Sequence, residues 1–557
     1  MLSSLLSTSS LLQQASRGLA SPSLHSVTFS AARWLNSWAT VDPDNWNAAN
    51  PAHAQNLVAG HWAGSAQSKT IPDPMNGEAF VSYPDTQVNE LDHFVTSLTS
   101  CPKSGLHNPY KNPERYVMYG AVCAKVAEEM RKPDVAEFFA SLIQRTSPKS
   151  WPQAMAELVV TRRFFENFSG DQVRFTARGF SVPGDHTGQT SNGLRWPYGP
   201  VALITPFNFR WRSPPCSSWA RCSWATSPWC TWTTGMHLLL LLLLQVSIVV
   251  EQLLRLLHHC GMPLTDVDLI HGNGRVVNEL LVRAQPRSTL FTGSQRVAEK
   301  LALDMRGKVF LEDAGYDWKV LGPDVQDVDY VAWQADQDAY ACSGQKCSAQ
   351  SLMLMHSNWR KAHASTRQLS DLTIGPVLSW TTKAMLEHMD KLLQLPGAQL
   401  LWGGQPLQGH SIPDCYGAIQ PTAVFVPLEA MRDPAALKLV TTEVFGPFQV
   451  VTEFDDGQLR SVLDVLEGMS HHLTAAVVSN DMRFLQEVLA HTVNGTTYVG
   501  IRARTTGAPQ NHWFGPAGDP RGAGIGTPEA IRLVWSCHRE VIHDFGPCTA
   551  TSQLKQS

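Results

Sequence analysis

The sequence predicts an α/β protein built on parallel sheets. Apolar runs that fit strands alternate with helical patterns from residue 201 to 311, and a second alternating series continues from Asp313 to about Asn480. Such alternation is typical of βαβ units, in which helices cover both faces of a parallel sheet. Hydrophobic residues make up 43% of the 557 residues, which excludes disorder over the whole length.

The expected elements follow one another in a simple order. Residues 46–82 are rich in Pro, Gly and Ala and predict an irregular leading arm, and helical patterns follow at Arg115–Arg131 and Val135–Ile143. Asp171–Arg195 is polar and alternating, which predicts a β-hairpin. The series after it predicts strands at Val201–Ile204, Val267–Ile270, Ser288–Phe291 and Val309–Leu311, and helices at Ser247–His259, Val276–Ala284 and Ser294–Met305.

Composition excludes several classes of function. Lys and Arg number 44 and Asp and Glu 48, so the chain has no overall positive field for nucleic acid or an anionic membrane. The leucine run Leu238–Leu244 and its apolar continuation fall short of the ~20 residues that a bilayer span requires. The 11 cysteines have irregular spacings that fit neither a disulfide framework nor a zinc site. We expect no nucleic-acid partner, no membrane span and no metal.

The first 40 residues have the composition of a targeting segment. No Asp or Glu precedes Asp42, Ser and Leu are abundant, and Arg17 and Arg33 supply positive charge. Such a leader is typical of a mitochondrial or chloroplast transit peptide, and a disordered tail without an address is the alternative. We assign residues 1–40 to the leader, and a reducing matrix or stroma would keep the thiols free.

Two motifs carry side chains suited to nucleophilic and acid–base chemistry. Cys347 lies beside Lys346 and small residues, and a thiolate benefits from a nearby positive charge and from backbone donors. Glu312 directly follows a predicted strand, where a carboxylate can reach a cleft and act as a general base. Taken alone, the first pattern also fits a packed apolar cysteine and the second a surface glutamate.

Three further motifs offer polar groups to a ligand. Asn208 follows a strand and can donate a hydrogen bond to an oxyanion. Gly293–Ser294 joins a strand to a helix whose N–H groups suit a phosphate, although the usual G-x-G-x-x-G pattern is absent. Glu443 and Phe445 offer a carboxylate for ribose hydroxyls and a ring for stacking. Each motif alone also fits an ordinary turn, and the glycine-rich Gly522–Gly526, which follows no strand, predicts a loop.

In this order and spacing, the motifs resemble the aldehyde dehydrogenase superfamily. Within it, four longer blocks resemble the plant- and algal-type mitochondrial Δ1-pyrroline-5-carboxylate dehydrogenases, also called glutamate γ-semialdehyde dehydrogenases. These blocks are Phe180–Asp185, Phe310–Gly315, Asp336–Cys347 and Gly507–Pro516. The resemblance runs from about residue 61 to residue 547 and is densest from Val246 onward.

The resemblance implies a reaction and its residues. Cys347 is the implied nucleophile, the Asn208 amide and the Cys347 backbone N–H hold the oxyanion, and Glu312 activates the water that releases glutamate. NAD is the implied hydride acceptor and a small aldehyde the substrate. The implied cofactor contacts are Phe207, Gly293, Ser294, Gly315, Glu443 and Phe445, and the implied substrate contacts are Ser348, Phe514 and Gly515.

The resemblance also implies an architecture. We expect a Rossmann-type cofactor domain at 41–311 with an oligomerisation hairpin inserted at 171–195, an α/β catalytic domain at 312–488, and a C-terminal oligomerisation segment at 489–557. A homo-oligomer in the mitochondrial matrix is expected, with the chloroplast as the alternative location. Two other functions stay open: the same fold acting on another small aldehyde, and a catalytically impaired paralogue that acts only as an oligomer partner.

Residues 210–245 depart from the family pattern. Five of the 18 tryptophans and three of the 11 cysteines lie between Arg210 and Thr234, among scattered prolines and without helical or strand periodicity. Codons compatible with these residues, read in a shifted frame, restore an apolar helix followed by a strand. We therefore interpret Arg210 to about Thr234 as an out-of-frame translation, and Leu238–Gln245 as a repeat or an unspliced remnant after which the frame recovers at Val246. If the stretch is translated as printed, we expect a central helix and strand of the cofactor domain to be missing and NAD binding to be poor.

Overall fold

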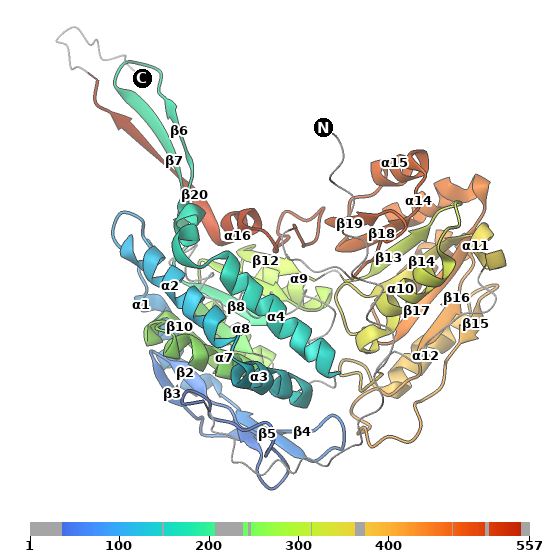
Figure 1. Cartoon of the computed structure of the whole chain (residues 1–557), viewed down its shortest axis with the longest axis horizontal. Helices are drawn as coiled ribbons and strands as arrows, with labels where there is room; N and C mark the ends of the chain where they lie inside the picture. Colours follow the sequence, from blue (N-terminus) through green and yellow to red (C-terminus); the bar gives the residue numbers. More distant parts are fainter. Residues whose placement is uncertain are drawn as a thin grey trace, which may run out of the picture.

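The computed structural model describes residues 36–146, 150–205, 238–242, 247–313, 315–362, 374–470, 472–506 and 512–546. Two seven-stranded sheets with their helices lie side by side, and a narrow three-stranded arm projects from the first (Figure 1). Residues 46–82, expected to be irregular, contribute short strands to the first unit. A small sheet is formed there by β1 (Ala52–His53), β5 (Ala79–Pro84) and β4 (Ser68–Pro72).

The first seven-stranded sheet contains the predicted βαβ series, in the order β12-β11-β8-β9-β10-β2-β3. Its inner strands pair in parallel, as expected, and two antiparallel strands extend one edge. The strands are β8 (Val201–Thr205), β9 (Leu238–Leu242), β10 (Val267–His271), β11 (Ser288–Thr292), β12 (Val309–Glu312), β2 (Asn56–Val58) and β3 (His61–Ala63).

Alternate residues of this sheet enter two different apolar clusters. Val201 and Leu203 pack with helices α2, α3, α4 and α7, whereas Ala202 and Ile204 pack with α1, α8 and α9. Since side chains alternate between the faces of a strand, this shows that both faces are covered. The helices are α1 (Asp92–Ser100), α2 (Glu114–Glu129), α3 (Pro133–Thr146), α4 (Trp151–Asn167), α7 (Ser247–His259), α8 (Gly274–Ala284) and α9 (Gln295–Asp304).

The run of leucines forms an inner strand of this sheet. β9 lies between β8 and β10, with Leu238 opposite both Val201 and Val267. The expectation of a missing central strand is therefore wrong. The proposed frame change and the candidate residues Phe207 and Asn208 lie outside the described residues.

The second seven-stranded sheet has the order β15-β16-β17-β14-β13-β18-β19. All neighbouring strands pair in parallel except β15 and β16. β19 pairs with β18, so this sheet extends past residue 488, where the expected catalytic domain ends. The strands are β13 (Asp317–Leu321), β14 (Gln350–His356), β15 (Gln399–Trp402), β16 (Thr422–Phe425), β17 (Phe448–Phe454), β18 (Thr474–Val478) and β19 (Thr496–Val499).

Helices cover both faces of the second sheet as well. Val320 and Leu354 pack with α12, α14 and α15, whereas Leu321 and Met353 pack with α10 and α11. These helices are α10 (Val328–Tyr340), α11 (Ser357–Ala362), α12 (Thr382–Leu393), α14 (Leu459–Glu467) and α15 (Met482–Ala490). Among the described residues, no helix combines the length and the apolar character needed to cross a membrane.

The projecting arm consists of β6, β7 and β20 (Figure 1). The expected hairpin is present as β6 (Phe180–Pro183) and β7 (Gln189–Pro197), but the first part of the predicted range forms a 3-10 helix, η2 (Gly170–Ala177). Burial of Val173 and Thr176, three residues apart, favours the helical turn there. After α16 (Pro528–Trp535), the C-terminal β20 (Ser536–Asp544) pairs along the whole of β7.

The folded part of the chain begins before residue 40. The Trp38 ring lies 5.3 Å from the ring of Phe138 and 5.6 Å from that of Phe139, centroid to centroid. The Thr40 N–H donates to Gln252 Oε1 at 3.0 Å, and Gln252 Nε2 donates to Thr40 Oγ1 at 2.8 Å. A leader that extends to residue 40 would therefore include residues of the folded unit.

Candidate active site

The ends of two strands of the first sheet meet the loop before β14 of the second. The Gly293 N–H, just after β11, donates to the carbonyl oxygen of Glu312, the last residue of β12, at 3.3 Å. Ligands of open α/β sheets bind beyond the carboxyl ends of the strands, which is where both residues lie. The fold thus brings the candidate general base next to the candidate phosphate-binding turn.

Gly315 joins this edge to the candidate nucleophile. A Cβ atom on Gly315 would lie 2.6 Å from the carbonyl oxygen of Cys347, 3.0 Å from its Cα and 2.6 Å from Glu443 Oε1. No side chain fits there, so only glycine permits this approach. Because Gly315 follows Glu312 by three residues, the same contact brings the end of β12 close to Cys347.

The loop that carries Cys347 has an uncommon backbone. Cys342, Ser343 and Gly344 have consecutive φ values of 74°, 54° and 64°. A left-handed conformation costs roughly 1–2 kcal/mol for each residue with a Cβ atom. A Cβ on Gly344 would also lie 1.9 Å from the carbonyl oxygen of Gly446, so this turn packs directly on the loop that follows Phe445. Such a turn persists only where its surroundings fix it.

Buried side-chain hydrogen bonds fix this turn. Ser343 Oγ donates to the Gly375 carbonyl at 3.1 Å and accepts from the Gly375 N–H at 2.8 Å. Gln345 Nε2 donates to the Pro376 carbonyl at 2.9 Å, and the Leu378 N–H donates to Gln345 Oε1 at 2.9 Å. The segment 375–378 therefore holds Ser343 and Gln345 in place, and these two residues fix the loop that carries Cys347.

The ammonium of Lys346, expected to assist the thiol, has a backbone partner. Lys346 is buried, and its Nζ donates to the Gln337 carbonyl oxygen at 3.1 Å. Its charge also helps to lower the pKa of Asp338. Cys347 itself is partly exposed and packs against the apolar cluster that contains Phe514.

Three acidic residues lie near Gly315 and Cys347, and two of them have raised pKa values. Glu312 is buried. Burial and the neighbouring Asp519 raise the pKa of Asp313 to about 6. Burial and the negative charge of Asp313 raise the pKa of Glu443 to about 8. A site that holds carboxyl groups near neutral pKa values is suited to proton transfer at physiological pH.

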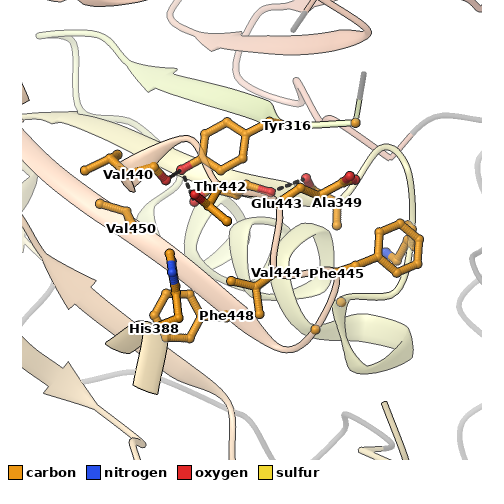
Figure 2. Close-up of a pocket in the computed structure, with 15 residues that line it drawn as sticks. Tyr316, Ala349, His388, Val440, Thr442, Glu443, Val444, Phe445, Phe448 and Val450 are labelled. Carbon is orange, nitrogen blue, oxygen red and sulfur yellow. Dashed lines mark hydrogen bonds between the residues drawn. The ribbon is translucent and has the colours of Figure 1, made fainter. Parts of the chain in front are cut away.

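Glu443 and Phe445 line a pocket next to Gly315 (Figure 2). Both come from the loop after α13 (Pro434–Val440), and Phe445 has a φ of 49°. The loop is tied to the core because Tyr316 Oη donates to the carbonyl oxygen of Val440 at 2.6 Å. The pocket therefore presents a carboxyl group and an aromatic ring beside the nucleophile loop.

The residues of the phosphate-binding turn fit a dinucleotide. Ser294 is the N-cap of α9, and its side chain makes no capping hydrogen bond. The first-turn N–H groups of a helix favour phosphate, and the adjacent Gly293 keeps the approach open. Ser294 and Glu443 thus offer backbone donors and a carboxyl acceptor, the kinds of group that bind a phosphate and a ribose hydroxyl.

The three candidate substrate residues lie close to this centre but are largely buried. Ser348 directly follows Cys347 and is buried. Phe514 is fully buried and pairs with Ile525, its N–H donating to the Ile525 carbonyl at 2.8 Å. Gly515 is tightly packed, since a Cβ on Gly495 would lie 1.8 Å from its carbonyl oxygen.

The glycine-rich segment Gly522–Gly526 was predicted to be a loop, but its position beside β12 was not predicted. The Leu311 N–H donates to the Arg521 carbonyl at 2.8 Å, and the Ala523 N–H donates to the Leu311 carbonyl at 2.9 Å. This segment thereby supports the edge strand that ends at Glu312. Sequence analysis also missed Lys319 and Asp338, which form a buried ion pair behind the Cys347 loop. In the sequence, the one signal at Asp338 was its place in the block Asp336–Cys347, which resembles the family.

A metal centre is not part of the described site. Within the ranges that the structure describes, no group of three or more His, Cys, Asp or Glu residues is arranged to hold a metal ion.

The sequence profile of the Aldehyde dehydrogenase family matches residues 62–519, and the chain belongs to this family of oxidoreductases. A mitochondrial Δ1-pyrroline-5-carboxylate dehydrogenase of Arabidopsis thaliana is 57% identical over 546 residues, which are 96% of each chain. A Linum usitatissimum protein described as a probable aldehyde dehydrogenase is 59% identical over 518 residues, 92% of each chain. The resemblance found in the sequence is thus confirmed.

Solved structures confirm the fold. An NAD-dependent aldehyde dehydrogenase from Sinorhizobium meliloti gives a TM-score of 0.73 at 19% identity, covering 92% of this chain and 99% of that one. Betaine aldehyde dehydrogenase from Staphylococcus aureus in complex with NAD+ gives a TM-score of 0.72 at 18% identity, covering 90% and 96%. The expected architecture of two α/β units with a β-sheet arm is therefore the aldehyde dehydrogenase fold.

Proposed function

We propose that this protein oxidises L-glutamate γ-semialdehyde, formed from Δ1-pyrroline-5-carboxylate, to glutamate with NAD in proline catabolism. The observation that carries the proposal is the 57% identity to the Arabidopsis enzyme over 96% of both chains. The meeting of Cys347, Gly315 and Glu443 at the end of β12 supports it, because these groups suit aldehyde oxidation through a covalent thioester.

In the first half of the reaction, the Cys347 thiolate adds to the aldehyde carbon. A carbon–sulfur bond forms, and the carbonyl oxygen becomes an oxyanion that the Cys347 N–H and the Asn208 amide stabilise. A bound NAD supplies the acceptor for the hydride that leaves this carbon, after which Cys347 carries a thioester. The anchored turn at residues 342–344 holds the sulfur in position for the attack.

In the second half, Glu312 takes a proton from water as the water oxygen attacks the thioester carbon. The carbon–sulfur bond then breaks, the sulfur leaves as the thiolate, and the product leaves as a carboxylate. Glu312 is buried at the end of β12, which shields its carboxyl from bulk water.

The proposed cofactor and substrate contacts are those that the family resemblance implies. Gly293 and Ser294 would bind the diphosphate at the start of α9, and Glu443 and Phe445 would bind the ribose and pack nearby. Phe207, together with Gly315, would complete the nicotinamide side. The α-carboxylate of the substrate would lie near Ser348, Phe514 and Gly515.

The arm is proposed to form a homo-oligomer. Its described residues expose large apolar side chains, since Ile542 is 61% exposed and Phe545 82% exposed. Apolar groups gathered on a projecting element favour contact with another chain, and a second copy of the arm would cover them. We also propose that residues before the folded unit direct the protein to the mitochondrial matrix, with the chloroplast as the alternative, because the Arabidopsis relative is mitochondrial.

The out-of-frame origin of residues 210–234 remains a proposal. Its composition supports it, with five tryptophans and three cysteines in 25 residues. Leu238–Leu242 takes the strand position between β8 and β10. Sequencing the transcript across this region tests the proposal, and a clean read that encodes the printed residues would contradict it.

The substrate is tested by following NADH formation with purified protein. We expect glutamate γ-semialdehyde to give the highest kcat/KM among short-chain aldehydes and semialdehydes, and NAD to exceed NADP. A higher kcat/KM for another aldehyde would replace the substrate but keep the reaction. The absence of turnover with every aldehyde, from a protein that is folded by circular dichroism, would indicate an impaired paralogue.

A further inference from the structure

A fully buried ion pair lies behind the nucleophile loop. Lys319, on β13, places Nζ 2.8 Å from Oδ2 of Asp338, on α10, and neither side chain is exposed to solvent. Two charges removed from water are tolerated only where further hydrogen bonds satisfy them, and removal of one partner leaves the other charge uncompensated. The surroundings of Asp338 meet this condition.

Asp338 accepts hydrogen bonds from three separate segments. Besides Lys319, Gln334 Nε2 donates to Oδ1 at 3.0 Å, and the Thr505 N–H donates to Oδ2 at 2.9 Å. The Thr506 N–H and hydroxyl both donate to Oδ1. Burial by itself would raise the pKa of Asp338, but Lys319, Thr506 and Lys346 outweigh it and hold the pKa below its usual range.

The carboxylate thereby ties the end of α10, which leads into the Cys347 loop, to the segment at residues 505–506. Next to Asp338, the carbonyl oxygen of Gln337 accepts a hydrogen bond from the ammonium of Lys346, the residue before Cys347. On the other side, Thr505 and Thr506 belong to the segment that follows β19 of the second sheet.

We propose that Asp338 is a positioning residue for the reaction. Its negative charge locks the Cys347 loop to the Thr505–Thr506 segment, and this sets how the aldehyde and its carboxylate approach the sulfur. The inference concerns the proposed aldehyde oxidation and rests on that function for its kinetic readout, but the reactivity of the Cys347 thiol provides a second readout that does not.

The central test compares three variants. Asp338→Asn keeps the size of the side chain but removes its charge and leaves Lys319 unpaired. The double variant Lys319→Met/Asp338→Asn removes both charges and keeps similar side-chain volumes. If the unpaired charge of Lys319 is the only cost of Asp338→Asn, the double variant regains the stability of the parent protein. Asp329→Asn makes the same chemical change at an exposed position on the same helix and serves as the matched control.

We expect Asp338→Asn and the double variant to lower kcat/KM for the aldehyde by about 10²-fold, since displacement by about 1 Å has this effect. We also expect both to change the rate at which iodoacetamide alkylates Cys347, measured by mass spectrometry across pH, and to leave the Kd for NAD near that of the parent. The control is expected to match the parent protein in all three measurements.

A double variant whose melting temperature, kcat/KM and alkylation rate all return to parent values would overturn the proposal, because the role would then be structural only. An Asp338→Asn protein that is folded and unchanged in both readouts would overturn it as well. If that single variant does not fold, the double variant decides the question. If the parent protein oxidises no aldehyde, the proposed function fails, and alkylation of Cys347 still tests the positioning.

Discussion

The two halves of the site are held in place in different ways. Glu312 ends β12, a strand that pairs with β11 on one side and is bordered on its other side by backbone hydrogen bonds of Leu311 to residues 521 and 523. Cys347 precedes β14, which lies inside the second sheet between β13 and β17, and its loop is fixed by buried side chains such as Ser343 and Gln345.

The difference reflects what each half must do. A nucleophile has to meet one carbon atom in one orientation, and its loop adopts an unfavourable left-handed turn that side chains must hold. A base has only to reach a water molecule, which tolerates a looser support. The pKa values of Asp313, next to Glu312, and of Glu443, beside the Cys347 loop, are raised, whereas that of Asp338 is lowered. Changes of protonation are therefore expected at Asp313 and Glu443.

Removal of the nucleophile is expected to have the largest effect. Cys347→Ser replaces the thiolate with a hydroxyl that is hardly ionised at neutral pH, so no thioester forms. We expect kcat to fall by roughly 10⁵–10⁶-fold, the size of effect seen when a covalent nucleophile is removed. Rapid-mixing measurements should then show no burst of NADH, and a variant that keeps more than a tenth of parent activity would exclude Cys347 as the nucleophile.

Removal of the base is expected to slow turnover less and to leave the first half-reaction intact. Glu312→Gln cannot accept the proton of water, so steady-state turnover should fall by about 10²–10⁴-fold. The thioester still forms, and rapid mixing should show one NADH per active site before the slow phase. If this variant shows no burst, Glu312 acts before the thioester rather than after it, and the distinction between the two halves is wrong.

Cofactor affinity is expected to depend on pH through the carboxyl groups near Gly315. With a pKa of about 8, Glu443 is largely protonated at pH 7, and a ribose hydroxyl donates better to its ionised form. Binding that favours the ionised form strengthens as pH rises towards 8, by at most about ten-fold per pH unit. Calorimetric titration with NAD should show this trend, and Glu443→Gln should flatten it. An unchanged slope in that variant would assign the effect to another group.

The smallest expected effect is on the stability of the folded protein. It concerns Glu251 on α7 of the first unit, which forms an ion pair with Arg255. Burial outweighs Arg255 and raises the pKa of Glu251 to about 7, unlike that of Asp338. Because the folded protein then holds this proton more tightly than the unfolded chain, stability should fall as pH rises from about 4.5 to 7, by on the order of 2–3 kcal/mol. Glu251→Gln should reduce this fall in melting temperature, whereas Asp338→Asn should not. Equal pH profiles for parent and Glu251→Gln would contradict the assignment.

Local pattern was sufficient for much of the fold and part of the site. The helix predicted at Arg115–Arg131 is found at Glu114–Glu129, and the strand predicted at Val201–Ile204 is found at Val201–Thr205, because apolar periodicity reports burial directly. Glu312 and Gly293 were picked out by their places after strands, and both lie at the ends of β12 and β11. The effect of Lys346 on the thiol stays a prediction: the structure shows its ammonium bonded to the Gln337 carbonyl, and sequence neighbourhood does not fix where a long side chain points.

The sequence by itself determined the α/β class, the family and the identities of the candidate nucleophile and base, since these depend on short-range periodicity and on motifs of adjacent residues. Only the tertiary structure decided which groups meet. The contact of Gly315 with Cys347, the use of a leucine run as β9, and the pairing of Lys319 with Asp338 and of Asp338 with Thr505 all join residues that no local pattern links. Such contacts arise because the chain must satisfy every buried polar group and fill every strand position at once.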